Sequence, residues 1–319
     1  MSRQNRSPRS FFVIALLLGS AVAAHATGVT EEASPPPEAL TVVDSRGVDV
    51  AVTNASRVVT LGSAVTEIAF AVGRGDRVVG VDSSSAYPPE GLEGVPRTGY
   101  VRALSAEGVL SLEPSLIIGS TDVGPPEVIE QLEDAGVPVF ILPEDDSFEG
   151  AKERVALVGR LLGAEAEADE VIAEIERDAQ LAEDIAAAVP PEERARVMFI
   201  YARGVGALSV SGTGTSAHAV IEHAGGRNAV TGYEGYRPLT AESAVAIDPE
   251  VLIFLESGLQ SIGGKEGLRE IPGITETSAF ENERILAFDG TYLLGFGPRV
   301  GQAVLELTQA LYPEIEATP

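Results

Sequence analysis

Two stretches of the sequence repeat the same pattern of side chains. Residues 104–118 read LSAEGVLSLEPSLII, and residues 239–253 read LTAESAVAIDPEVLI. In each, a Ser or Thr can cap a short helix that carries Glu in its first turn, and a later Pro introduces an apolar strand. The two stretches are offset by 135 residues, which is far too long for the repeat of a solenoid protein. The repeat therefore predicts two similar α/β lobes, with a ligand site in the cleft between them.

Short strand-like and helical runs alternate in both halves of the chain, which favours an α/β fold with mainly parallel strands. In the first half we expect strands at 57–61, 77–81, 116–119 and 138–142, and helices at 64–72, 106–112 and 126–135.

Residues 148–189 differ from both halves, because apolar side chains recur there at helical spacing. We interpret this stretch as a connecting helix, with a break near Gly159 or Gly163. The prediction is therefore two Rossmann-like lobes joined by a long helical backbone. The N-terminal lobe would comprise 40–147 and the C-terminal lobe 190–319.

The first residues have the pattern of an export signal. Three arginines precede an apolar run at 11–18, and Ala-His-Ala at 24–26 fits a cleavage site. The alternative, a transmembrane anchor, is disfavoured because the run is short for about 30 Å of hydrocarbon. We predict a cleaved signal peptide at 1–26, a flexible leader at 27–39, and a location in the periplasm.

Composition removes several classes of function. The chain has 48 acidic and 22 basic residues, with a formal net charge of −26. Such a charge argues against binding nucleic acid or anionic membranes through basic patches. Cysteine is absent, which excludes disulfides, thiol catalysis, Cys-ligated metals and a lipoprotein-type Cys anchor.

Few residues suggest catalysis. His218 and His223 are five apart on an expected helix, so a packing role is favoured over a metal pair. The segment 212–217 reads GTGTSA and resembles a dinucleotide fingerprint, but a turn that caps a helix beginning near Ser216 is the simpler interpretation.

Tyrosine and arginine occur together in the loop before each repeated helix. Tyr100 and Arg102 precede the first helix, and Tyr236 and Arg237 precede the second. A guanidinium near a phenol stabilises the phenolate, which is a ligand for ferric iron. Ordinary packing of Tyr100 is the alternative.

Five segments carry a resemblance to a known family. They read SAVTEIAFAVG (63–73), GYVRALSAEGVLSLEP (99–114), GTGTSAHAVIEHAGGRNAV (212–230), GYRPLTAES (235–243) and DGTYLLGFGPR (289–299). Over nearly its whole length after residue 26, the chain resembles the periplasmic haem-binding proteins of bacterial ABC importers, the HmuT/ShuT type. Their class also carries cobalamin and ferric siderophores.

The resemblance implies the class III periplasmic binding fold and a carrier with no enzymatic activity. The carrier would be a monomer that captures ferric haem and hands it to an ABC permease with its ATPase. An outer-membrane receptor would be a further partner. Tyr100 matches the axial iron ligand and Arg102 the Arg that hydrogen-bonds it. Glu107 and Glu242 match the two carboxylates that dock on the permease.

One position departs from some relatives, which have a second His ligand where this chain has Arg203. Arg cannot ligate iron because it stays protonated, but it can pair with a haem propionate or hydrogen-bond the Tyr. Tyr236 and Arg237 are expected as further cleft contacts. The alternatives are a corrinoid or siderophore carrier of the same fold, and a periplasmic enzyme that uses a nucleotide.

Overall fold

The computed structural model describes residues 39–315. The predicted signal peptide, and the leader up to residue 38, lie outside the described residues. No described helix is both long and apolar enough to cross a membrane.

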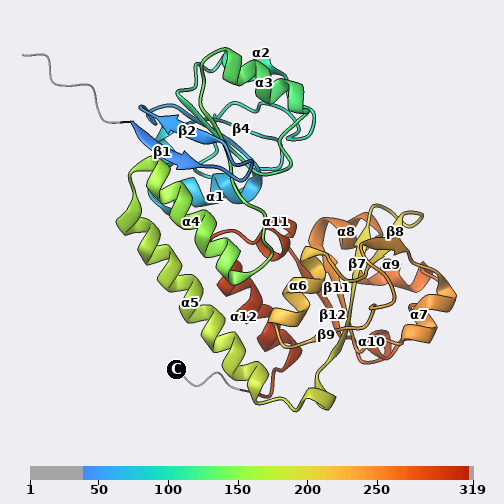
Figure 1. Cartoon of the computed structure of the whole chain (residues 1–319). Helices are drawn as coiled ribbons and strands as arrows, with labels where there is room; N and C mark the ends of the chain where they lie inside the picture. The colour runs from blue at the N-terminus through green and yellow to red at the C-terminus, as the bar shows by residue number, and fades with distance from the viewer. Residues whose placement is uncertain (1–38, 316–319) are drawn as a thin grey trace, which may run out of the picture. The chain divides into compact units, whose positions relative to one another are not determined.

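The first half of the described chain, drawn in blue and green in Figure 1, forms a four-stranded parallel sheet in the order β4-β3-β5-β6. All four strands are apolar and largely buried, as parallel strands covered on both faces require. Its strands are β3 (Val58–Leu61), β4 (Val78–Val81), β5 (Leu116–Gly119) and β6 (Val139–Ile141). Its helices are α1 (Ser63–Ala71), η1 (Gly75–Arg77), α2 (Ala106–Leu110) and α3 (Pro126–Asp134), so the helices and strands expected in this half are confirmed.

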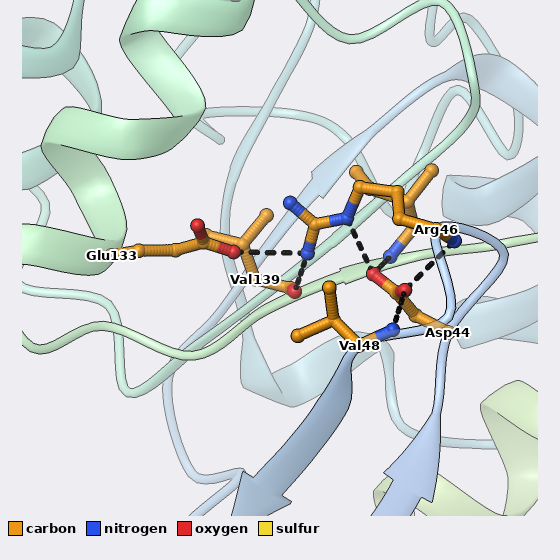
Figure 2. Close-up of polar contacts among 6 residues, drawn as sticks. Asp44, Arg46, Val48, Glu133 and Val139 are labelled. Carbon is orange, nitrogen blue, oxygen red and sulfur yellow. Dashed lines mark hydrogen bonds and ion pairs between the residues drawn. The ribbon is translucent and has the colours of Figure 1, made fainter.

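An antiparallel hairpin of β1 (Leu40–Val43) and β2 (Asp49–Val52) precedes this sheet. Figure 2 shows how its turn is fixed. The buried carboxylate of Asp44 accepts hydrogen bonds from the backbone N–H groups of Arg46 (2.8 Å) and Val48 (3.1 Å). The Arg46 guanidinium contacts the Asp44 carboxylate (2.6 Å), the carbonyl of Val139 (2.8 Å) and the carboxylate of Glu133 (2.9 Å). Arg46 thus ties the hairpin to β6 through a hydrogen bond and to α3 through an ion pair.

The helical stretch after β6 consists of two helices, α4 (Phe148–Leu162) and α5 (Glu165–Ala187). Gly163 separates them in the left-handed conformation, with φ of 60°, so the predicted break is confirmed. The C-terminal α12 (Val300–Leu311) packs along α5 (Figure 1). This approach requires Gly301, where a Cβ atom would lie 2.7 Å from the carbonyl oxygen of Ile175.

The second half of the chain forms a six-stranded mixed sheet, in which β10-β8-β7-β11-β12 are consecutive and β9 also pairs with β7. The expected parallel pairing holds for β7, β9, β11 and β12, whereas β8 and β10 are antiparallel. The strands are β7 (Arg196–Ala202), β8 (Leu208–Ser211), β9 (Arg227–Asn228), β10 (Tyr236–Pro238), β11 (Val251–Leu255) and β12 (Ile285–Phe288). The helical elements are η2 (Pro191–Glu193), α6 (Ser216–His223), α7 (Ala241–Ile247), α8 (Glu256–Ser261), α9 (Gly264–Gly267), η3 (Leu268–Glu270), α10 (Ser278–Glu281) and α11 (Gly290–Leu294).

The sequence repeat corresponds to a structural repeat. The Ser105 hydroxyl accepts a hydrogen bond from the N–H of Gly108 at the start of α2, and Thr240 caps α7 through the N–H of Ser243. Each helix then leads into a buried central strand, β5 or β11. Both predicted caps are confirmed. The repeat places the loops before α2 and α7 at equivalent positions of the two sheets.

Candidate functional site

A cavity of about 700 Å³ collects residues from both halves of the chain. Arg102 contributes from the loop before α2, and the other lining residues come from β7, β8, β10 and the β7–β8 turn. These are Tyr201, Arg203, Gly206, Ala207, Leu208, Ser209, Tyr236 and Pro238. The structure therefore brings together three residues predicted for ligand binding, Arg102, Arg203 and Tyr236.

The β7–β8 turn places Arg203 at this cavity. The N–H of Arg203 donates to the carbonyl of Ala207 (2.9 Å), which closes the turn. Gly204 has φ of +93°, a conformation that favours glycine. Its N–H donates to the hydroxyl of Ser261 in α8 (2.8 Å). One hydrogen bond within the turn and one to α8 thus fix its conformation. This conformation in turn fixes the position of Arg203 after the end of β7.

Arg203 forms a pair with Tyr201. Its Nη2 and Nε atoms donate to the Tyr201 hydroxyl at 3.0 and 3.3 Å. The central guanidinium carbon lies 5.0 Å from the centre of the Tyr201 ring. The hydrogen bond with Tyr201 raises the pKa of Arg203 above its ordinary value. The guanidinium of Arg203 is thus held against Tyr201 at the cavity wall.

Tyr236 forms the neighbouring wall on the edge strand β10, and its ring centre lies 6.0 Å from that of Tyr201. Burial raises the pKa of Tyr236, although hydrogen bonds with Ser211 and Thr215 oppose this effect. Tyr236 is therefore a neutral phenol at pH 7 and offers an aromatic surface with a hydroxyl. Arg237 turns to the other side of the strand, where its guanidinium lies over the ring of Tyr233 at 4.3 Å.

Tyr100 is more exposed than Tyr236, with 54% of the residue accessible to solvent against 45%. Arg102 makes its hydrogen bond to Asp122, with 2.6 Å between Nη2 and Oδ1. This bond raises the pKa of Arg102. The hydrogen bond that the resemblance implied from Arg102 to Tyr100 is thus made to Asp122 in the structure.

A second, smaller cavity of about 260 Å³ also has lining residues from both halves of the chain and includes several acidic side chains. Asp122, Glu144 and Asp146 supply its carboxylates, and Arg154 of α4 lies at its wall. Arg154 is buried and donates to the carbonyl of Phe296 (2.8 Å). Burial lowers the pKa of Arg154. Anionic groups of a ligand are thus favoured at Arg102 and Arg203 and disfavoured in this second cavity.

Glu107 and Glu242 lie in the first turns of α2 and α7, and both are exposed. Neither forms an ion pair with another of the residues 39–315. Their equivalent positions follow from the repeat. The structure thus places two free carboxylates on two matching helices.

The segment 212–217 is a capped turn. Thr215 accepts a hydrogen bond from the N–H of His218 and starts α6. At Gly212 a Cβ atom would lie 2.2 Å from the carbonyl oxygen of Tyr233, so close packing explains this glycine. This agrees with the interpretation as a turn.

The two histidines of α6 differ in their surroundings. His223 packs against Phe148, with ring centres 4.6 Å apart. His218 approaches the amide of Asn228 at 3.4 Å. Within the described part of the chain, no three His, Asp or Glu side chains form a cluster that could hold a metal ion.

Tyr201 is a residue of the candidate site that was not predicted from the sequence. The sequence does contain a signal for Tyr201, because the pattern Tyr-x-Arg occurs at 201–203 as it does at 100–102. Asp122 was also missed. Its sequence context carries no sign of its contact with Arg102.

Comparisons with known proteins identify the family. The family model described as "Periplasmic binding protein" matches residues 58–292. The solved structure of "Periplasmic heme-binding protein RhuT from Roseiflexus sp. RS-1 in apo form" is 42% identical, with a TM-score of 0.77, over 82% of this chain and 99% of that chain.

Two further relatives are described as substrate-binding or cobalamin-binding proteins. The "Uncharacterized ABC transporter substrate-binding lipoprotein YvrC" of Bacillus subtilis is 26% identical over 86% of each chain. The "Cobalamin-binding protein" of Halobacterium salinarum is 29% identical over 80% of this chain and 69% of its own.

Proposed function

Because the chain belongs to the periplasmic binding protein family, we propose that it captures ferric haem and delivers it to an ABC permease with its ATPase. Haem is the ligand named for the RhuT relative, and ABC transport is named for YvrC. The haem site is the cavity lined by Arg102, Tyr201 and Tyr236. The protein is a carrier and performs no catalytic step.

The observation that carries this proposal is the chemistry of the cavity wall. In a chain with 48 acids and 22 bases, two arginines and two tyrosines line this cavity and no carboxylate does. Haem is a flat, largely apolar molecule with two carboxylate groups and a ferric ion. Aromatic and aliphatic walls suit its ring, and guanidinium groups suit its propionates. The volume of about 700 Å³ falls in the usual range for small-molecule sites.

Two phenols can approach the iron. We assign the axial ligand to Tyr100, with Arg102 as the nearby cation. Tyr100 does not itself line the cavity, but it is exposed and lies two residues before Arg102 in the same loop. Tyr201 is the counterpart from β7, and its hydroxyl is already paired with Arg203. The remaining N–H groups of Arg203 can bind a propionate. Tyr236 adds a wall for the ring. Arg237 faces the other side of β10, with its guanidinium over Tyr233, so we assign it no contact with haem.

Delivery is assigned to Glu107 and Glu242, which present carboxylates on α2 and α7 for arginines of the permease. The signal-like residues 1–26 would export the chain to the periplasm. There it would act as a monomer, and an outer-membrane receptor would supply haem. Nucleic acid is not a partner, given the net charge of −26.

A haem titration with absorption spectra tests the function. Wild-type protein should bind haem and show the charge-transfer bands of a phenolate-ligated ferric iron, and Tyr100→Ala should lose these bands and most of the affinity. Tyr87→Phe is the matched control, because Tyr87 is similarly exposed and packs against Arg299, away from the cavity.

Titration with aquocobalamin and with a ferric siderophore gives the opposing outcomes. Tight binding of either one, without binding of haem, would overturn the assignment and support a carrier of the alternative ligand. Stabilisation by a nucleotide alone would support an enzyme instead. Unchanged spectra in Tyr100→Ala, with haem still bound, would reject Tyr100 as the ligand and leave the carrier function intact.

A further inference from the structure

The arginines of the two Tyr-x-Arg segments, 100–102 and 201–203, have different hydrogen-bond partners. In the second, Arg203 donates two hydrogen bonds to the hydroxyl of Tyr201. In the first, the guanidinium of Arg102 is paired with Asp122 at 2.6 Å. The cation nearest to Tyr100 along the chain is thus engaged by a carboxylate.

The backbone fixes this pairing. Asp122 lies in the loop that follows β5, and Arg102 lies in the loop before α2. The N–H of Gly124 donates to the carbonyl of Val101 (3.0 Å), and the N–H of Leu104 donates to the carbonyl of Gly124 (3.0 Å). These two bonds flank Arg102 and hold its loop against the Asp122 loop, while Val101 and Leu104 are buried. The carboxylate therefore stays within reach of the guanidinium.

Arg203 has no such competitor. Its guanidinium forms no ion pair with a carboxylate among residues 39–315. It binds the hydroxyl of Tyr201 instead.

We propose that Asp122 is a positioning residue that sets haem affinity through Arg102. Its carboxylate competes with the anionic groups of the ligand for the same guanidinium, and it repels those groups at the edge of the cavity. A carrier must also release its ligand to a permease, and this competition favours release. The inference rests on the proposed function, because it concerns the same cavity.

The size of the effect follows from exposure. About half of each side chain is accessible, at 60% for Arg102 and 48% for Asp122. Exposed ion pairs are weak, typically worth up to about 1 kcal/mol, so removal of the competitor should change affinity by roughly two- to fivefold. We expect Asp122→Asn to tighten haem binding by this factor, mainly through slower dissociation.

A double-mutant cycle with Arg102→Ala tests the mechanism. The gain from Asp122→Asn should appear in the wild-type background and shrink to near zero in the Arg102→Ala background. Asp122→Glu keeps the charge and should retain wild-type affinity. Glu130→Gln, an exposed position on α3, removes the same charge elsewhere and should leave the rate of haem dissociation unchanged.

The outcomes separate the inference from the function on which it rests. If wild-type protein does not bind haem, the proposed function fails. If wild-type protein binds haem and Asp122→Asn binds equally or more weakly, the competition is rejected. An equal gain in both backgrounds would also overturn it, because the effect would then not pass through Arg102.

Discussion

Glu67 and Arg299 are 232 positions apart in the sequence and form a two-pronged ion pair, with Nε–Oε2 at 3.0 Å and Nη2–Oε1 at 2.9 Å. Glu67 belongs to α1, and Arg299 immediately precedes α12. The guanidinium carbon also lies 3.7 Å from the ring centre of Tyr87 and 4.9 Å from that of Tyr292. The conspicuous segment DGTYLLGFGPR (289–299) thus supplies a contact between the two halves of the chain.

Removal of one partner should be costly, because the side chain of Glu67 is only 3% exposed. Arg299→Ala leaves a buried carboxylate without its cation and should lower the free energy of unfolding by about 3 kcal/mol. Urea unfolding measures this loss. Arg269→Ala is the control, since its ion pair with Glu266 is exposed, and it should cost less than about 0.5 kcal/mol. Equal losses of unfolding free energy in the two variants would show that the ion pair between Glu67 and Arg299 adds no more stability than an exposed one.

The hairpin before the first sheet should depend on Asp44, whose side chain is fully buried. Asp44→Ala removes the acceptor for the backbone N–H groups of Arg46 and Val48. We expect a loss of about 2–3 kcal/mol, with faster hydrogen exchange in β1 and β2. Asn54→Ala removes an exposed turn acceptor and should change stability by about 0.5 kcal/mol or less. A loss in Asp44→Ala no larger than in that control would contradict the role assigned to the buried carboxylate.

His223 should make stability depend on pH. Burial between Phe148 and Phe296 lowers its pKa, and this outweighs the opposing charges of Asp145 and Glu222. Below the ordinary value of 6.5, the unfolded chain therefore binds more protons at His223 than the folded chain, so acidification favours unfolding.

The measurement is a comparison with His223→Gln, which cannot gain this charge. As pH falls from 7 to 5, wild-type protein should lose stability relative to the variant, as measured by urea unfolding. The other acidic groups titrate in both proteins and cancel in the difference. A difference that is constant across this range would show that His223 is protonated alike in the folded and unfolded chains.

Arg203 should contribute more to haem binding than an ordinary surface arginine. Arg203→Ala removes the cation from the hydroxyl of Tyr201 and from the cavity wall. We expect a weaker Kd for haem, because a charge-assisted hydrogen bond at the cavity wall is lost. Arg203→Lys keeps the charge and should lose less. Arg227→Ala, an exposed arginine elsewhere, should bind haem as wild type does; an equal loss there would indicate a general effect of charge.

Local features of the fold could be predicted because a few neighbouring residues determine them. The caps at Ser105 and Thr240 and the break at Gly163 depend on one turn of chain. The repeat then predicted where each helix leads into a buried strand. The hairpin at 40–52 was not predicted, although the Gly47 turn, with φ of +76°, is a local signal of the same kind.

Contacts of the candidate site were harder to predict because they depend on tertiary pairing. Tyr201 ends an apolar run and looks like a core residue until the β7–β8 turn brings Arg203 to its hydroxyl. The pairing of Asp122 with Arg102 depends on two loops that meet through backbone hydrogen bonds. The packing of α12 on α5 depends on the absence of a side chain at Gly301. No periodicity in the sequence encodes these contacts.

The last prediction concerns Glu107 and Glu242, which lie at matching positions of the repeat and form no ion pair with another of the residues 39–315. Arginines bind carboxylates through two parallel hydrogen bonds, so two such contacts would fix the orientation of the carrier on its permease. The alternative is that both acids only stabilise the starts of α2 and α7, at about 0.3–1 kcal/mol each.

The double variant Glu107→Gln, Glu242→Gln separates these roles. Recognition predicts normal folding and haem binding but a large loss of permease-dependent haem uptake in reconstituted vesicles. Glu113→Gln, Glu250→Gln is the matched pair, since it removes two acids that follow the same helices, and it should leave uptake intact. Full uptake in the first double variant, with a small loss of stability, would leave only the helix-start role.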